Sequence, residues 1–327
     1  MHDDVSLSEI RSGLLALLPR WGLASKAEVR LLLISENATF LASDPATGRR
    51  IVLRVHRPGY HRRDEILSEL AWTADLISGG IVETPRAVPM LDGGLIAQLI
   101  HGKERRDVVA FEFMTGREPT PAAGLVPWFE KLGAITGRLH RHSRSWNKPA
   151  GFARKVWDFD AMLGDRPLWG DWRAAIGLEP AQQELLERTA AELKRRLGEY
   201  GKGERFGLIH ADLRLTNLLV EGGRLGVIDF DDCGFSWFAY DFAAAISFIE
   251  TDPVVPDLMA AWVAGYRQVL PFSADDEAML PVFVMLRRML LTAWLASHSE
   301  TPTSAEIGHS YTAGTADLAE AFLTGRG

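Results

Sequence analysis

The spacing of apolar residues changes along the chain from strand-like alternation to helical periodicity. Residues 6–20 have the spacing of a short amphipathic helix, and residues 28–57 follow as strands with a turn at residues 44–48. Apolar residues then recur at helical spacing over residues 66–77, and strand-like runs lead to residues 108–114. The first third of the chain is therefore predicted to consist mainly of strands.

A segment rich in threonine and proline, residues 115–121, ends this pattern and predicts a hinge. Amphipathic helices are predicted beyond it at residues 128–139 and 186–197, and helical spacing returns from about Phe242 onward. A hairpin over residues 218–228, with two glycines in its turn, interrupts these helices. The second part of the chain is therefore predicted to be mainly helical.

This order of elements predicts an α+β fold with two lobes, and not a chain of alternating strands and helices. We expect a small, strand-rich lobe over residues 1–114 and a larger, mostly helical lobe over residues 115–327. The chain has 327 residues, of which 47% are hydrophobic, and this supplies enough apolar material for a core in each lobe.

Charge and cysteine content exclude several classes of protein. The net charge is −7, with 36 basic and 43 acidic residues, so the strong basic footprint of a nucleic-acid-binding protein is absent. No apolar run reaches the roughly 18 residues of a membrane span, and the first residues lack the basic-then-apolar order of a signal peptide. The single cysteine, Cys233, cannot form an internal disulfide. We expect a cytoplasmic protein without a nucleic-acid or membrane partner.

Two neighbouring segments carry the residues best suited to chemistry. His210, Asp212 and Asn217 form an H-x-D-x-x-x-x-N pattern, and an apolar strand ends on Asp229. The predicted hairpin should bring the two segments together, because its strands return to the same end. Phosphoryl transfer needs a carboxylate that orients the attacking hydroxyl, and metal ions that neutralise phosphate charge. Asp212 suits the first task, and Asn217 and Asp229 offer the hard oxygen ligands that magnesium prefers.

These segments resemble the catalytic loop and metal-binding aspartate of the kinase fold, in the form found in the aminoglycoside phosphotransferase and choline kinase superfamily. The resemblance implies transfer of phosphate from ATP, with Mg²⁺, to a hydroxyl acceptor. Asp212 would be the catalytic base or hydroxyl-orienting group, and Asn217 and Asp229 would hold the metal. It also implies that His210 braces the loop and that Asp241, in the next helix, steadies it.

The resemblance implies that the lobe over residues 1–114 binds the nucleotide. Arg54 stands in the place of the strand lysine that grips the α- and β-phosphates in this family, and arginine keeps the positive charge. The usual partner is a glutamate in the next helix, for which Glu69 is the best match and Glu65, one turn earlier, is the alternative. The other arginines of residues 49–63 are expected to be solvated.

Two further segments of this lobe occupy positions that bind nucleotide in the family. Ser35 and Asn37 lie where the family has its phosphate-covering loop, although the glycines of G-x-G-x-x-G are missing and an ordinary turn explains the segment equally well. Glu112 and Met114 lie in the segment that connects the lobes and meets adenine through backbone groups.

The acceptor is implied to bind the lobe over residues 115–327. From Asp231 to the end there are 13 acidic and 4 basic residues, and such a field attracts cations. We therefore predict a small amine-bearing alcohol, resembling an aminoglycoside, choline or homoserine. Acids scattered over solvated helix faces explain the same count equally well.

Three alternatives remain open at this point. The segment from Arg54 to Glu69 also resembles bacterial stress-response kinases of the superfamily, which phosphorylate protein serine or threonine. A pseudokinase would bind nucleotide without transfer, but it would be expected to lack Asp212, Asn217 or Asp229. A haloacid-dehalogenase-type phosphatase would use Asp229 as nucleophile and would leave Asp212 and Asn217 unexplained.

Overall fold

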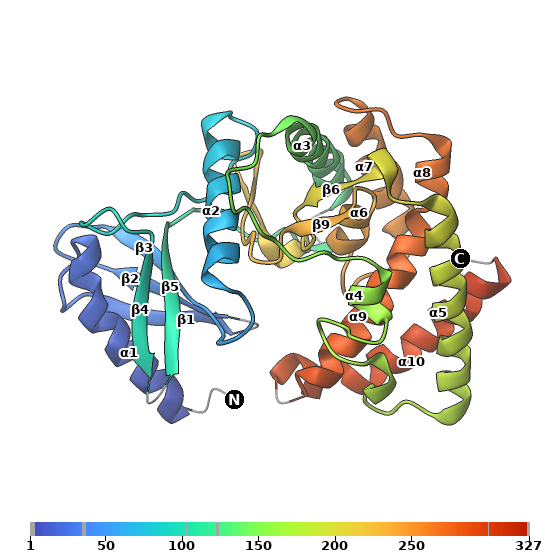
Figure 1. The fold of residues 1–327 in the computed structure, drawn as a ribbon, viewed down its shortest axis with the longest axis horizontal. Helices are drawn as coiled ribbons and strands as arrows, with labels where there is room; N and C mark the ends of the chain where they lie inside the picture. Colours follow the sequence, from blue (N-terminus) through green and yellow to red (C-terminus); the bar gives the residue numbers. More distant parts are fainter. Residues whose placement is uncertain (1–3, 35–36, 102–103, 122–123, 300, 326–327) are drawn as a thin grey trace. The chain divides into compact units, whose positions relative to one another are not determined.

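Strands and helices separate along the chain in the computed structural model, which describes residues 4–34, 37–101, 104–121, 124–299 and 301–325. The chain divides into two units, described one at a time (Figure 1). Unit 1 contains Met1–Thr115 and Lys148–Ala153, and unit 2 contains Gly116–Asn147 and Arg154–Gly327.

Unit 1 is built on an antiparallel sheet of five strands in the order β1-β2-β3-β5-β4. The strands are β1 (Glu28–Ile34), β2 (Ala38–Ser43), β3 (Arg50–Val55), β4 (Ile96–His101) and β5 (Glu104–Glu112). The predicted strand-rich first third is therefore confirmed.

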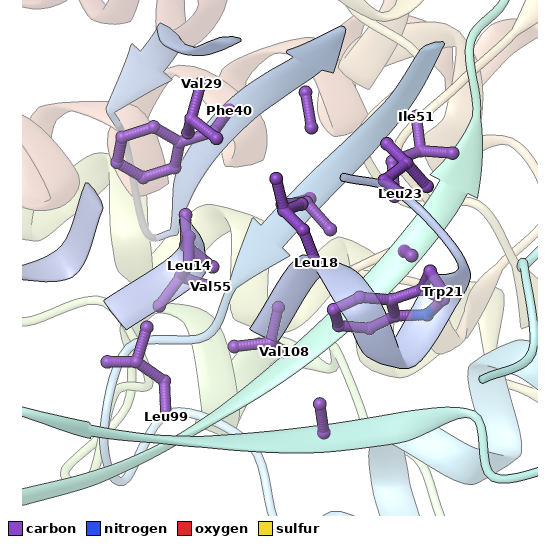
Figure 2. Packing of buried hydrophobic residues seen from close by; sticks show 14 of the residues in the cluster. Leu14, Leu18, Trp21, Leu23, Val29, Phe40, Ile51, Val55, Leu99 and Val108 are labelled. Carbon is purple, nitrogen blue, oxygen red and sulfur yellow. The ribbon is translucent and has the colours of Figure 1, made fainter. Parts of the chain in front are cut away.

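The N-terminal helix covers one face of this sheet with its apolar side chains. Helix α1 (Asp4–Leu17) and the 3₁₀ helix that follows it (Leu18–Trp21) carry the buried residues Leu14 and Trp21, which cluster with Val55 and Val108 of the sheet (Figure 2). Burial of such side chains is the main stabilising contribution of this layer.

The opposite face of the sheet packs against helix α2 (Arg63–Ser78), whose Ile66 and Leu70 cluster with Val109 of β5. Successive side chains of a strand point to opposite faces. Arg54 lies next to Val55 in β3 and opposite Val109 in register, so it lies on the face covered by α2.

Unit 2 is mainly helical. Its helices are α3 (Val126–Ser145), α4 (Phe159–Leu163), α5 (Pro180–Tyr200), α6 (Tyr240–Ala245), α7 (Val255–Arg267), α8 (Ala274–Ala278), α9 (Leu280–Ser297) and α10 (Pro302–Thr324). The predicted hairpin is confirmed as β7 (Leu218–Glu221) and β8 (Arg224–Val227), and a 3₁₀ turn, Leu215–Asn217, precedes it. A second pair, β6 (Phe206–Ile209) and β9 (Gly234–Trp237), was not predicted.

Helices α3 and α7 approach one another closely because each has a glycine at the contact. A Cβ atom on Gly265 would lie 1.8 Å from the carbonyl oxygen of Glu130, and one on Gly133 would lie 2.0 Å from that of Trp262. Neither position can take a side chain unless the helices separate.

One helical segment has the length and composition of a membrane span. Residues Ala274–Ser297 are long enough and apolar enough to cross a membrane, but 78% of the apolar 18-residue stretch within them is buried inside the structure. A core helix meets the same criteria, and α9 packs against α5, α6 and α10. The segment carries Arg287 and Arg288 in its middle, and both arginines are buried.

Candidate active site

The loop that follows β6 carries three of the predicted residues. His210 comes directly after β6, Asp212 follows two positions later, and Asn217 ends the 3₁₀ turn before β7. Asp229 follows the end of β8, and the neighbouring Ile228 N–H donates a hydrogen bond of 2.9 Å to the Asn217 carbonyl oxygen. The hairpin β7–β8 therefore brings the two motif segments together, as the sequence predicts.

Both oxygens of the Asp212 carboxylate accept hydrogen bonds. The amide nitrogen of Asn217 donates to Oδ2 at 2.8 Å, and Arg214 Nε donates to the same oxygen at 3.2 Å. Oδ1 accepts from Arg287 Nη2 at 2.6 Å. The side chain thus lies between two guanidinium groups.

These charges determine the protonation state of Asp212. Burial raises the pKa of its carboxyl, but the nearby guanidinium groups of Arg214 and Arg287 outweigh that effect. The pKa of Asp212 therefore lies below its ordinary value, and the group is an anion at neutral pH. An anion can accept a hydrogen bond from an alcohol.

His210 uses its ring to brace this loop. Its Nε2 lies 3.2 Å from the Ile228 carbonyl oxygen, and its Nδ1 accepts the Asp212 N–H at 3.2 Å. Nε2 therefore carries the proton and Nδ1 does not, so the ring is in its neutral Nε2–H form. The ring holds the two motif segments in place.

Asp241, at the start of α6, holds the same loop from the other side. Its carboxylate accepts the N–H of Ala211 at 2.7 Å and that of His210 at 3.3 Å. His140 of α3 lies 2.9 Å from the same carboxylate, and its other ring nitrogen lies 3.0 Å from the Tyr266 hydroxyl. Burial lowers the pKa of His140 despite the carboxylate. The steadying role implied for Asp241 thus has a direct geometric basis.

Two residues of these segments have a backbone conformation that side chains disfavour. Ala211 has φ 67° and Asp229 has φ 61°, both in the left-handed region. Such conformations cost about 1–3 kcal/mol each and persist where the surrounding contacts enforce them. Asp241 supplies such a contact for Ala211, which directly precedes Asp212, whereas Asp229 is itself a motif carboxylate.

The segment after Asp229 is anchored through its backbone. Arg154 donates to the carbonyl oxygens of Asp231 and Cys233, and Trp157 Nε1 donates to that of Asp232 at 2.8 Å. Cys233 is a buried free thiol, which agrees with its interpretation as a small apolar residue.

In unit 1, Arg54 pairs with Glu69 of α2. Arg54 Nη2 lies 2.5 Å from Glu69 Oε2, and the two residues are only 4% and 1% exposed. Glu65, the other possible partner, accepts the Arg62 N–H at 2.7 Å and caps the start of α2. The neighbouring arginines of this stretch are exposed. A buried guanidinium with a dedicated carboxylate distinguishes Arg54 from them.

The other residues predicted to bind nucleotide also belong to unit 1. Ser35 lies outside the described residues. Asn37 Oδ1 accepts the Arg57 N–H at 3.1 Å. Glu112 ends β5, and its N–H donates to the Arg86 carbonyl oxygen at 2.9 Å. Met114 follows β5 and is half-buried.

Comparison with protein families decides the identity of the chain. A profile of the phosphotransferase enzyme family (APH) matches residues 30–275, which is most of the chain. The chain belongs to this family. The match includes the loop that holds Asp212 and the Arg54–Glu69 pair.

Three known proteins are similar to this phosphotransferase over most of its length. The structure of the microcompartment-associated aminopropanol kinase is 45% identical with a TM-score of 0.89, and the match covers 99% of both chains. Amicoumacin kinase of Bacillus subtilis (strain 168) is 25% identical over 280 residues, 82% of this chain and 79% of that protein. Homoserine kinase of Chelativorans sp. (strain BNC1) is 30% identical over 227 residues, 65% of each. The chain is a phosphotransferase that acts on a hydroxyl acceptor.

Sequence reasoning missed Arg287, although its guanidinium contacts the motif aspartate of this phosphotransferase. Arg287 lies in α9, 75 positions after Asp212. The available signal was a pair of adjacent arginines in the middle of an otherwise apolar helix. A charge in a buried helix needs a partner, so the pair pointed to acids elsewhere in the fold.

Proposed function

We propose that this phosphotransferase is an ATP- and magnesium-dependent kinase of a small amino alcohol, such as 1-amino-2-propanol. The observation that carries this proposal is the 45% identity to an aminopropanol kinase over 99% of both chains. The presence of Asp212, Asn217 and Asp229 speaks against the pseudokinase, and membership of a phosphotransferase family speaks against the dehalogenase-type phosphatase. A protein serine or threonine acceptor remains the alternative. We propose a cytoplasmic location, without a membrane or nucleic-acid partner.

Asp212 would orient the acceptor hydroxyl and take up its proton. The carboxylate is ionised and is held by donors on both oxygens, so its direction is fixed before the acceptor arrives. Each carboxylate oxygen can accept more than one hydrogen bond, so an alcohol can add to the contacts already present.

Asn217 and Asp229 fit a magnesium ion by their chemistry. The amide nitrogen of Asn217 bonds Asp212, which leaves the amide oxygen as the end suited to a cation. Asp229 adds a carboxylate, so the pair offers the hard oxygens that Mg²⁺ takes alongside phosphate oxygens. The bound ion would neutralise phosphate charge during transfer.

Unit 1 would bind the nucleotide. Arg54 would contact the phosphates, with Glu69 fixing the direction of its guanidinium. The turn with Ser35 and Asn37 would cover the phosphates. Adenine would meet the backbone at Glu112 and Met114. Because the Glu112 N–H is already bonded, that residue would use its carbonyl oxygen.

Replacement of Arg54 tests this assignment. We expect Arg54→Ala to lower kcat/KM for ATP strongly and Arg54→Lys to retain much of it, because lysine keeps the charge. Alanine would also leave Glu69 buried without its partner, which costs about 3–5 kcal/mol for a buried pair. The double variant Arg54→Ala/Glu69→Ala is the control, since it should recover stability but not activity. Normal activity of Arg54→Ala would show that phosphate is gripped elsewhere.

Many acids of unit 2 are engaged in structural contacts and cannot account for a cationic acceptor. Asp241 bonds the catalytic loop, Glu250 pairs with Arg288, and Glu277 pairs with Arg267. The Asp232 carboxylate acts electrostatically on Tyr240, which contacts Arg287 beside Asp212. Burial raises the pKa of Tyr240, the guanidinium group of Arg287 lowers it, and the carboxylates of Asp212 and Asp232 raise it. An amine that approaches this side of the transfer site would be attracted by the Asp232 carboxylate.

Three acceptors of similar shape test the proposed substrate class. We expect 1-amino-2-propanol to have a lower KM than 1,2-propanediol or lactate, because it is the only cation of the three. Its advantage should shrink as salt screens the field. Kinetics with ATP and magnesium over a range of salt give the answer, and casein tests the protein-acceptor alternative. A preference for the diol or lactate would overturn the amine but not the kinase assignment.

A further inference from the structure

Arg287 of α9 is buried, only 2% exposed, and connects the catalytic loop to helix α6 and the residues that follow it. Its Nη2 donates to Asp212 Oδ1 at 2.6 Å. Its Nη1 lies 3.4 Å from the Ala211 carbonyl oxygen and 3.2 Å from the Tyr240 hydroxyl, and its Nε donates to Ser247 Oγ at 3.0 Å. A planar group held at four points has one orientation.

The adjacent residue provides a comparison within the same helix. Arg288 is also buried, 5% exposed, and it donates to Glu250 Oε2 at 2.8 Å, to Thr315 Oγ1 at 2.9 Å and to the Tyr311 carbonyl oxygen at 2.9 Å. None of these contacts involves the loop that carries Asp212. Arg288 therefore stabilises the packing of α9 and α10, whereas Arg287 acts on the catalytic loop.

We propose that Arg287 is a positioning residue for phosphate transfer: by fixing Oδ1 of Asp212 from α9, it determines the direction in which Asp212 meets the acceptor hydroxyl. This inference rests on the proposed role of Asp212. The opposite oxygen is held from within the loop by Asn217, so the carboxylate is clamped between its own loop and α9.

A clamp of this kind acts on the chemical step and not on nucleotide binding. Loss of Arg287 leaves Asp212 with its contacts to Asn217 and Arg214 only, so the carboxylate can rotate about its side-chain bonds. A misplacement of about 1 Å can slow a reaction by about 10²-fold. The KM for ATP should stay near the wild-type value, because Arg287 touches none of the residues proposed to bind the nucleotide.

The experiment compares Arg287→Met, Arg287→Lys and Arg288→Met with 1-amino-2-propanol, ATP and magnesium. We expect Arg287→Met to lower kcat about 10²-fold with little change in the KM for ATP. Arg287→Lys should recover part of kcat, since lysine reaches Asp212 but cannot make all four contacts. Arg288→Met is the matched control, because it should lower the melting temperature by a similar amount and leave kcat nearly unchanged.

A double variant separates positioning from a general structural effect. Added to Asp212→Asn, the Arg287→Met change should cause little further loss of kcat, because the group that it positions is already gone. If Arg287→Met does not fold, Tyr240→Phe and Ser247→Ala each remove one contact of Arg287. Lower kcat at unchanged KM for ATP in these variants would support the inference, and normal kcat would overturn it.

The outcomes also separate this inference from the proposed function. Near-normal turnover of Asp212→Asn would overturn the proposed role of Asp212. A slow Asp212→Asn together with an Arg287→Met variant as active as Arg288→Met would overturn only the role of Arg287. If the amino alcohol is not a substrate, release of phosphate from ATP to water is measured on the same variants and is judged by the same criteria.

Discussion

Asp212→Asn should lower kcat by roughly 10²–10⁴-fold, the usual contribution of a positioned general base. Asparagine has the same shape, so the contacts with Asn217 and Arg287 can partly remain. What is lost is the negative charge that accepts the proton of the acceptor hydroxyl. Nucleotide binding should be nearly intact, and steady-state kinetics with a binding titration measure both quantities.

A matched control for this variant is Glu250→Gln. Glu250 is also a buried carboxylate of unit 2 that pairs with a buried arginine, Arg288, but it does not contact Asp212. Its replacement should cost stability without a large loss of kcat. Equal losses of kcat in the two variants, or normal turnover of Asp212→Asn, would remove Asp212 from the proposed mechanism.

Asp229→Ala should abolish the magnesium-dependent part of nucleotide binding, because the ion would lose its charged protein ligand. A ligand that binds the folded state raises the melting temperature, so thermal shift with ATP, with and without magnesium, measures the effect. The wild type should gain a further shift from magnesium, and the variant should not.

The left-handed backbone conformation of Asp229 makes a second substitution necessary. With φ 61°, this position penalises alanine, whereas asparagine tolerates the left-handed region. Asp229→Asn thus removes the charge with less strain, and it should lose the magnesium response as well. Glu221→Gln, at the exposed turn of the neighbouring hairpin, should keep it. A full magnesium response in Asp229→Asn would show that this carboxylate is not a ligand.

The sequence predicted the part of the site that lies within one short stretch of chain. His210, Asp212, Asn217 and Asp229 are close in the sequence, and a hairpin with a recognisable glycine turn joins their segments. Local turn chemistry therefore determines their proximity, and motif spacing is enough to find them. The pairing of Arg54 with Glu69, the best match in the sequence, needed the structure to exclude Glu65, which caps the start of α2.

The rest of the site depends on packing between distant segments, which spacing does not reveal. Arg287 and His140 lie 75 and 72 positions from Asp212 in the sequence. Arg287 contacts Asp212, and His140 contacts Asp241, only because helices α9 and α3 pack beside the catalytic loop. The strands β6 and β9 were missed for a related reason. Each has only four residues, and their pairing joins segments on either side of the hairpin.

The two adjacent arginines of α9 fix the rotation of that helix about its own axis. Neighbouring residues of a helix point about 100° apart, and here one meets Asp212 while the other meets Glu250. A turn of α9 about its own axis, or a slide by one residue, would break both ion pairs at once. A smaller side chain elsewhere in α9 therefore cannot be accommodated by moving the helix, and the resulting void should remain as an unfilled cavity.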